Sequence, residues 1–306
     1  MGRIIVAGSV NMDIVSKVEE LPQPGQSVKS SNFKFVPGGK GANQAVAASR
    51  LGGRVSFLGK VGKDAFGKTI TAFLKKEKLQ LHSLQVSKTK PTGTVMILVD
   101  RKGTNIMSWM GDCSNLDISI SQVKNLSIQQ GDIVVSTLEI PQVVTKYLFK
   151  AARKAGATTI LNVSPVVTTS SSLLSLADYL VVNEHELKFF TKAKKTPSTS
   201  KELAAAIKRL AVKSQIIIVT LGKEGLVYLK NGKLAKISGY KVKAVDTTAA
   251  GDSFLGAFAT AISKHQALKQ AANFANAAAA LSVQKVGAST SLPRLKEVEN
   301  FLKNYA

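Results

Sequence analysis

From residue 132 onward, short apolar runs alternate with longer stretches whose apolar residues recur every three or four positions. Short runs rich in β-branched side chains are typical of buried strands, whereas the longer periodicity is typical of amphipathic helices. We therefore predict strands over residues 133–136, 158–163, 179–182 and 216–220. We predict helices over residues 141–155, 199–213, 253–263 and 267–284. Strands that alternate with helices in this way favour a mostly parallel sheet covered by helices.

The first half of the chain follows a different rhythm. Residues 3–8 form an apolar run that ends in glycine, and residues 55–61 form a second run that leads into a helical pattern over 68–78. Residues 93–100 and 105–111 are strand-like and are joined by Arg101-Lys102-Gly103-Thr104, which predicts a hairpin. Proline and glycine punctuate residues 17–35, which indicates a small excursion of strands outside the core.

The stretch with the clearest chemistry runs from residue 245 to residue 254, between a strand-like segment (233–245) and an apolar helix. Ala249, Ala250 and Gly251 carry almost no side chain, so their backbone N–H groups are open to an anion at a helix N-terminus. Asp252 adds a carboxylate that can take a proton from a neighbouring hydroxyl. An anion site that contains a base suits phosphoryl transfer. Close helix packing, with Asp252 as an ordinary first-turn residue, explains the same sequence equally well.

Two polar segments near the N-terminus are candidates for ligand binding. Asn11 and Asp13 lie two positions apart, so in an extended segment both side chains point to the same face. Gly38-Gly39-Lys40-Gly41 lets the backbone approach a ligand closely, and Asn43 follows in the first turn of a helix. Ordinary turns remain the alternative for both segments, and spacing alone favours a turn at Asn11 and Asp13.

Residues 62–69 match the phosphate-binding P-loop pattern, with a strand before and a helix after. Asp64 and Phe66 are anionic and bulky for a loop that should surround phosphate with bare amides. A strand that ends in a matching aspartate does not clearly follow. These residues argue against a P-loop.

Charge raises a nucleic-acid hypothesis, because the 306-residue chain has a formal net charge of +23. The 42 lysines and arginines are spread over all three thirds of the chain, without a dominant basic block, which argues against specific nucleic-acid binding. No apolar run is long enough to span a membrane, and the first residues lack a signal-peptide pattern. A single cysteine, Cys113, fits a reducing compartment, so we expect a cytoplasmic protein.

The two glycine-rich segments together resemble the paired signatures of the ribokinase (pfkB-type carbohydrate kinase) family. The N-terminal signature matches residues 38–43, and the C-terminal one matches residues 246–252. Asn11-Met12-Asp13, residues 62–67, residues 183–186 and Thr220-Leu221-Gly222 fall in the expected order, so the resemblance covers essentially the whole chain. One departure is Ala249, where many members of the family carry glycine. In this family residues 62–67 are not the phosphate loop, which makes the P-loop match accidental.

The resemblance implies a role for each candidate residue. Asp252 is similar to the catalytic base, and Ala249, Ala250 and Gly251 to the anion hole. The implied sugar contacts are Asn11, Asp13, Gly39, Lys40, Asn43, Glu139 and Asp252. The implied nucleotide contacts are Asn183, Thr220, Gly222, Gly225, Gly251 and Asn276. Glu186 is similar to the residue that organises Mg²⁺ through water, and the implied K⁺ ligands are Asp246, Thr248, Ser282, Lys285, Gly287 and Ser291. Lys285 can act only through its carbonyl, because an ammonium has no lone pair.

The resemblance also implies an architecture and a reaction. The expected fold is α/β, a single ribokinase-like three-layer sandwich over residues 1–306. A small β-sheet lid is inserted at about 16–36 and 92–111, and it pairs subunits into a homodimer. The expected reaction is ATP-dependent transfer of the γ-phosphoryl group to O5 of D-ribose. Deoxyribose, fructose or a nucleoside is the alternative acceptor, and a basic nucleic-acid-associated protein on the same scaffold is the competing hypothesis.

Overall fold

The computed structural model describes residues 2–212, 215–230 and 232–305, and the strands in this part of the chain form two sheets. The larger sheet has nine strands in the order β13 (Lys233–Ile237), β12 (Leu226–Lys230), β11 (Ile216–Thr220), β10 (Tyr179–Asn183), β9 (Thr158–Asn162), β8 (Ile133–Ser136), β1 (Ile4–Ala7), β4 (Val55–Gly62), β5 (Leu84–Ser87). All neighbouring strands from β11 to β5 are parallel, and only β12 runs against its neighbours.

Helices cover both faces of the large sheet. Successive side chains of a strand point to opposite faces, and the apolar strands therefore present apolar side chains on both faces. In β1, Ile4 and Val6 belong to one buried core, and Ile5 and Ala7 belong to the other. The first core is closed by α1 (Lys40–Arg50), α2 (Ala65–Lys76), α8 (Ala250–Ser263), α9 (Leu268–Ser282) and α10 (Leu295–Asn304). The second core is closed by α3 (Ile120–Lys124), α4 (Gln142–Lys154), α5 (Ser171–Leu174), α6 (Glu184–Thr191) and α7 (Ser200–Leu210). The result is a three-layer α/β sandwich.

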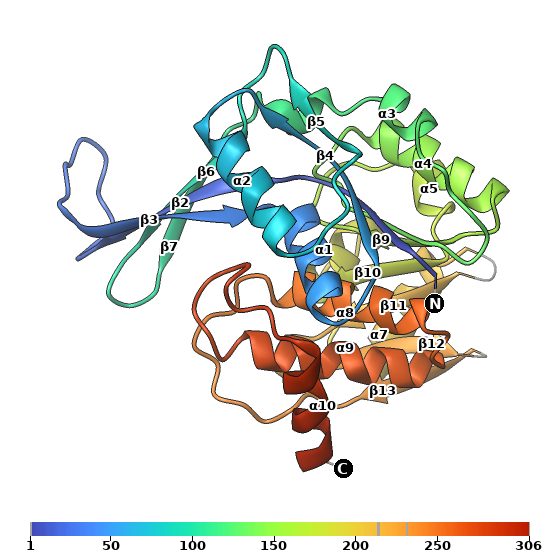
Figure 1. The fold of residues 1–306 in the computed structure, drawn as a ribbon. Coiled ribbons are helices and arrows are strands. Elements are labelled where there is room, and N and C mark those ends of the chain that lie inside the picture. Colours follow the sequence, from blue (N-terminus) through green and yellow to red (C-terminus); the bar gives the residue numbers. More distant parts are fainter. Residues whose placement is uncertain (1, 213–214, 231, 306) are drawn as a thin grey trace.

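The smaller sheet projects from the body at the left of Figure 1. Its four strands run in the order β3 (Ser30–Gly38), β2 (Asn11–Val18), β6 (Gly93–Val99), β7 (Asn105–Trp109). Several large apolar side chains on it are exposed, namely Phe33, Phe35, Met96, Ile106, Met107 and Trp109. The antiparallel pairing of β6 with β7 confirms the predicted hairpin. β2 begins at Asn11, whereas the sequence placed the start of the lid at about residue 16.

Three further boundaries differ from the sequence-based expectation. The strand predicted up to residue 245 ends at Ile237, because its partner β12 begins at Leu226, which pairs with Ile237. The C-terminal helical pattern begins at Ala250, three residues earlier than predicted. The predicted helix over 199–213 ends at Leu210, and residue 213 lies outside the described residues. No helix in the described ranges is long and apolar enough to cross a membrane.

Candidate active site

The predicted site residues gather at the carboxyl ends of the parallel strands. Asn11 follows β1, Glu139 follows β8, Asn183 ends β10, and Thr220 ends β11. β1 lies between β4 and β8, and the direction of the strand order changes there: the chain passes from β1 to β4 and β5 on one side and later returns to β8 on the other. Ligands in open α/β sheets bind at such a switch point. The N-termini of α1 and α8 bring the two glycine-rich segments to the same place.

Asp252 is the buried carboxylate at the start of α8. Its Oδ2 accepts a hydrogen bond from Asn43 Nδ2 at 3.1 Å, and its Oδ1 accepts one from Gln44 Nε2 at 3.0 Å. Burial raises the pKa of Asp252 to about 6, against the opposing influence of Lys40 and of the two amides. The carboxylate is therefore ionised at neutral pH, and it is a stronger base than an exposed aspartate.

Two more acids and one lysine surround this carboxylate. Burial raises the pKa of Asp13 to about 7, and the charges of Glu139 and Asp252 act in the same direction. Burial alone would lower the pKa of Lys40, but Asp252 and Glu139 raise it above its ordinary value. Glu139 Oε2 accepts hydrogen bonds from the Ser9 hydroxyl and, at 3.2 Å, from the backbone N–H of Lys40. The cluster has the donors and acceptors that a polyhydroxy ligand requires.

Gly39 allows the start of α1 to lie against the segment that follows β1. Its φ is +91°, and a Cβ there would lie 2.8 Å from Val10 Cα and 2.9 Å from the Ser9 carbonyl oxygen. A side chain would therefore collide with backbone that cannot move away. Glycine at this position keeps the start of α1, which carries Lys40 and Asn43, against the backbone of residues 9–11.

Asn11 is held by a partner that the sequence did not indicate. Asn115 Nδ2 donates to Asn11 Oδ1 at 2.7 Å, and Asn115 Oδ1 accepts from the Val10 backbone N–H at 3.0 Å. Both asparagine side chains are buried. Because Asn115 uses the oxygen of the Asn11 amide, the Nδ2 end of Asn11 is the end available to a ligand.

The loop before Asp252 is small and open. Ala249 adopts the left-handed conformation, with φ +59°, and α8 begins at the next residue. A Cβ added at Gly251 would meet nothing within 4 Å. Open space therefore lies over the N-terminal turn of α8, where N–H groups and the helix dipole favour an anion.

A cavity of about 260 Å³ continues from this turn. The predicted nucleotide-contact residues that line it are Thr220, Gly222, Gly225, Gly251 and Asn276. Ala250, Val242, Ala279, Ala280 and Val283 complete much of the wall, which is therefore small and apolar with a few polar groups. Such a lining suits a nucleoside next to a phosphate-binding turn.

Asn183 and Glu186 form the N-terminal cap of α6 instead of lining that cavity. Asn183 Oδ1 accepts from the backbone N–H groups of His185 and Glu186 at 2.9 and 2.8 Å. Glu186 Oε2 accepts from the Asn183 backbone N–H at 2.8 Å. Burial raises the pKa of Glu186, although this hydrogen bond and the charge of Lys40 oppose the shift.

Five of the six residues predicted to hold K⁺ lie on two adjoining loops, and the sixth, Ser282, is the last residue of α9. Asp246 accepts hydrogen bonds from the Thr248 hydroxyl at 2.6 Å and from the Gly287 backbone N–H at 2.8 Å. Burial acts to raise the pKa of Asp246, but these hydrogen bonds lower it overall. The remaining predicted ligands are Ser282, Lys285 and Ser291. The Lys285 ammonium pairs with Glu297 at 2.6 Å, so it is turned to another partner.

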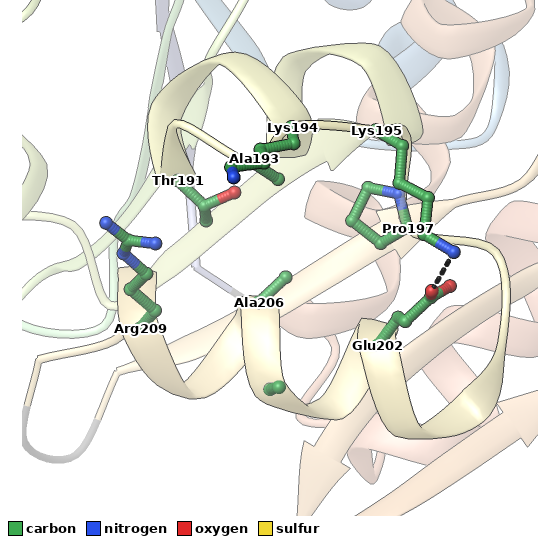
Figure 2. A pocket seen from close by; sticks show the side chains of 9 residues that line it. Thr191, Ala193, Lys194, Lys195, Pro197, Glu202, Ala206 and Arg209 are labelled. Atoms are coloured by element: carbon green, nitrogen blue, oxygen red, sulfur yellow. Dashed lines mark ion pairs between the residues drawn. The ribbon is translucent and has the colours of Figure 1, made fainter.

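A second cavity, of about 270 Å³, lies between α6 and α7. Figure 2 shows Arg209 on one side and the ion pair of Lys195 with Glu202, 2.6 Å long, on the other. In the described part of the chain its lining shares no residue with the predicted site. It does not change the location of the candidate active site.

The P-loop-like segment is already filled by its own aspartate. Asp64 Oδ1 accepts from the Gly67 backbone N–H at 2.8 Å, and Asp64 Oδ2 accepts from the Thr92 backbone N–H at 2.8 Å. Burial acts to raise the pKa of Asp64, but hydrogen bonds from the backbone N–H groups of Thr92 and Gly67 lower it overall. An anionic side chain therefore occupies the place that a phosphate would take.

Comparison with known proteins places this geometry in a family. The sequence matches the pfkB family carbohydrate kinases over residues 1–295. The chain belongs to the pfkB family of carbohydrate kinases. It is similar to a ribokinase of Schizosaccharomyces pombe, with 37% identity across 99% of this chain and 100% of that protein.

Solved structures of pfkB-family kinases agree with the fold over the whole chain. A ribokinase of Thermotoga maritima has a TM-score of 0.88 at 32% identity, covering 99% of this chain and 100% of that one. The Arabidopsis thaliana ribokinase complexed with ribose and ATP has a TM-score of 0.87 at 33% identity, covering 99% of each chain. The expected ribokinase-like α/β fold is confirmed.

Two side chains that hold site residues in this pfkB-family kinase escaped the sequence analysis. Gln44 follows Asn43 directly, but adjacent helix positions point in different directions, so its sequence position did not reveal contact with Asp252. Asn115 lies in a short 3₁₀ helix, Ser114–Asp117, more than 100 residues from Asn11. No local pattern could have identified that pair, because only the tertiary fold brings its two members together.

Proposed function

We propose that this chain transfers the γ-phosphoryl group of ATP to O5 of D-ribose and so produces ribose 5-phosphate. One observation carries the proposal. The first turn of α8 holds Asp252 among buried acids and amides, while Ala250 and Gly251 of the same turn line the 260 Å³ cavity. A base for a hydroxyl and a site for an anion therefore share one helical turn. The similarity to ribokinases, including one complexed with ribose and ATP, supports this pair of substrates.

In the proposed reaction Asp252 removes the proton from the 5-hydroxyl as the bond from O5 to the γ-phosphorus forms. The bond from that phosphorus to the bridging oxygen breaks, and the electron pair leaves with ADP. A pKa of about 6 keeps Asp252 ionised at neutral pH and close to the pH at which a base works best. The backbone N–H groups of Ala249, Ala250 and Gly251 would stabilise the charge on the phosphoryl oxygens.

The sugar would be held by the polar cluster around Asp252. We assign its hydroxyl contacts to Asn11, Asp13, Gly39, Lys40, Asn43 and Glu139. Three of these groups are fixed by other parts of the protein: Asn11 by Asn115, Glu139 by Ser9, and Asn43 by Asp252 itself. Fixed partners reduce the ordering that binding would otherwise require.

ATP would occupy the cavity, with its phosphates directed at the first turn of α8. We assign nucleotide contacts to Thr220, Gly222, Gly225, Gly251 and Asn276, with Asn183 near the phosphates. Within the described residues no group of three or more acidic, histidine or cysteine side chains is arranged to hold a metal ion. Mg²⁺ commonly binds through one carboxylate, waters and substrate phosphates. A single carboxylate, that of Glu186, is therefore enough for this role. The bound Mg²⁺ would neutralise phosphate charge.

The two adjoining loops offer a K⁺ site with the required chemistry. Asp246 supplies the negative charge, and its hydrogen bonds favour the ionised form. Thr248, Ser282, Lys285, Gly287 and Ser291 would contribute oxygen atoms, mainly of the backbone. With its ammonium paired to Glu297, Lys285 can offer its carbonyl without placing a second cation at the site. A bound K⁺ would hold the loop that leads to the anion site.

The smaller sheet would act as a lid and as a subunit contact. We propose that its strands close over the sugar, because β2 carries both Asn11 and Asp13. Its exposed face carries Phe33, Met107 and Trp109, an apolar surface that pairing with a second copy would bury. The single-domain organisation, the homodimer and the cytoplasmic location stay predictions.

A coupled assay of ADP release tests the proposal, with ATP, Mg²⁺ and K⁺ present. Ribose, deoxyribose, fructose, adenosine and pseudouridine are offered in turn. We expect a clear preference for ribose, and mass spectrometry and NMR of the product should place the phosphate on O5. Preference for another acceptor would overturn the ribose assignment and keep the kinase. Absence of turnover on all five, together with salt-dependent DNA binding, would favour the nucleic-acid hypothesis.

A further inference from the structure

Gln44 is a fully buried polar side chain whose amide is directed at Asp252. It lies in α1, is 0% exposed, and donates from Nε2 to Asp252 Oδ1 at 3.0 Å. Asn43, the other donor to Asp252, uses the opposite carboxylate oxygen. Each oxygen of the carboxylate is thus fixed by one amide, and the plane of the carboxylate is fixed by the pair.

A close approach of α1 and α8 makes the Gln44 contact possible. A Cβ added at Gly256 would lie 2.5 Å from Ala47 Cβ and 2.6 Å from the Gln44 carbonyl oxygen. A larger residue at position 256 would therefore push the helices apart. The glycine lets the glutamine side chain of one helix span to the first turn of the other.

Stability alone does not explain a glutamine at this position. Gln44 Oε1 is buried and has no hydrogen-bond partner among the described residues. An unsatisfied buried amide oxygen is unfavourable, and an apolar side chain of the same size would avoid it. What the glutamine supplies, and an apolar side chain cannot, is the hydrogen bond to Asp252.

We propose that Gln44 is a positioning residue for phosphoryl transfer, which orients Asp252 and keeps it ionised. The inference rests on the proposed role of Asp252 as the base. Gln44 has no access to solvent and reaches the reaction only through Asp252. Gln44 donates a hydrogen bond to the ionised carboxylate. The same hydrogen bond is weaker when the carboxyl group is protonated, so it favours the ionised form.

Charged side chains on neighbouring segments also influence the titration of Asp252. Lys40 of α1 favours its ionised form, whereas Glu139, after β8, disfavours it. Asp13 of β2 interacts with Asp252 as a like charge. The α9 helix, packed against α8, carries a single titratable residue, Lys269, in its first turn. Titration of the site is therefore that of a coupled set, and the measured quantity is the apparent pKa of its acid limb.

The test compares pH profiles of kcat/KM for the wild type, Gln44→Met and Gln44→Glu. Asp252 must be ionised to act, so activity falls as pH falls through the apparent pKa. Gln44→Met keeps the volume but removes the donor, and we expect the acid limb to move up by about 1–2 pH units. Gln44→Glu adds a like charge and should move the limb further.

Gln122→Met is the matched control. Gln122 is also a buried glutamine, and its Nε2 donates to the Gly59 carbonyl at 3.2 Å, outside the site. We expect this variant to lose stability with an unchanged acid limb. If Gln44→Met lowers kcat equally at every pH, with the limb in place, Gln44 is merely structural and the proposal is overturned.

An NMR titration of the carboxyl carbon of Asp252, assigned with Asp252→Asn, provides a readout that needs no sugar. The apparent pKa should rise from wild type to Gln44→Met. If the wild type phosphorylates no sugar, the proposed function fails, but the titration still decides whether Gln44 keeps Asp252 ionised. An unchanged titration would overturn the inference even in an active kinase.

Discussion

The first turn of α8 separates two regions that are built in opposite ways. On the sugar side, buried polar side chains bind one another: Asp252 with Asn43 and Gln44, and Asn11 with Asn115. On the nucleotide side, half of the residues that line the cavity are glycines and alanines. The sugar side depends on polar groups that neighbouring side chains hold in place, and the nucleotide side depends on small residues that leave space.

The difference indicates how each region should respond to substitution. On the sugar side an isosteric change that alters one polar atom of a bonded pair should be severe, because it would leave the buried partner in that pair unsatisfied. On the nucleotide side added volume should matter most, because small residues leave the space that ATP would fill.

The largest expected effect follows from Asp252→Asn. Loss of the base should lower kcat by about 10²–10⁴-fold, while the sugar still binds by calorimetry. Asp132→Asn is the control. Asp132 is also a buried carboxylate, but it pairs with Arg3 just before β8, at the amino ends of the parallel strands and away from the site. It should lose stability and keep kcat. Near-normal turnover of Asp252→Asn would remove the assignment of the base.

The pH dependence of kcat/KM should report the titration of Asp252. With a pKa of about 6, Asp252 loses its charge as pH falls, so kcat/KM should fall about tenfold between about pH 7 and pH 5. Initial rates in buffers of constant ionic strength measure the limb. A rate that stays constant down to about pH 5 would contradict the raised pKa and its cause, burial.

Added volume on the nucleotide side should raise the KM for ATP. Ala280→Leu places three more carbons into the cavity wall, and we expect about a tenfold higher KM for ATP with unchanged ribose affinity. Ala205→Leu makes the same change in the second cavity and should alter neither value. Equal loss of ribose and ATP binding in Ala280→Leu would show that the two regions are not separate.

The K⁺ loops adjoin the nucleotide side through residues 245–248. We expect potassium to give a higher rate than sodium at equal ionic strength, because the resemblance to the pfkB family implies a site that potassium fills. Rates with potassium, sodium and a large organic cation measure the effect. Equal rates in all three would argue against the site formed around Asp246.

The smallest effect is expected at the P-loop-like segment. Lys68 is exposed, and the loop before it is closed by Asp64. Lys68→Ala should therefore leave kcat and the KM for ATP essentially unchanged. Loss of ATP binding in this variant would place the nucleotide at residues 62–69 and contradict the assignment of the cavity.

Much of the fold follows from the sequence because its signals are local. Strands such as β8 and β11 are continuous apolar runs, and the amphipathic pattern of α4 directly identifies its buried face. The end of β13 could not be predicted, since it depends on where its partner strand begins. Boundaries that are set by a neighbour carry no signal in the segment itself.

The candidate site divides in the same way. Asp252 and its small loop could be identified because a helix N-terminus with missing side chains is visible locally. Gln44 and Asn115 could not, because each acts through a contact made far along the chain. The raised pKa values of Asp13 and Asp252 come from burial and from the charge of Glu139, and both causes exist only in the folded protein.

A crystal structure with ribose and a non-hydrolysable ATP analogue tests the central claim most directly. We expect the 5-hydroxyl of ribose within hydrogen-bond distance of Asp252. The γ-phosphate should lie at the N–H groups of Ala250 and Gly251, with adenine in the 260 Å³ cavity. A sugar on the same side of the α8 turn as the nucleotide, or a nucleotide outside that cavity, would contradict the account.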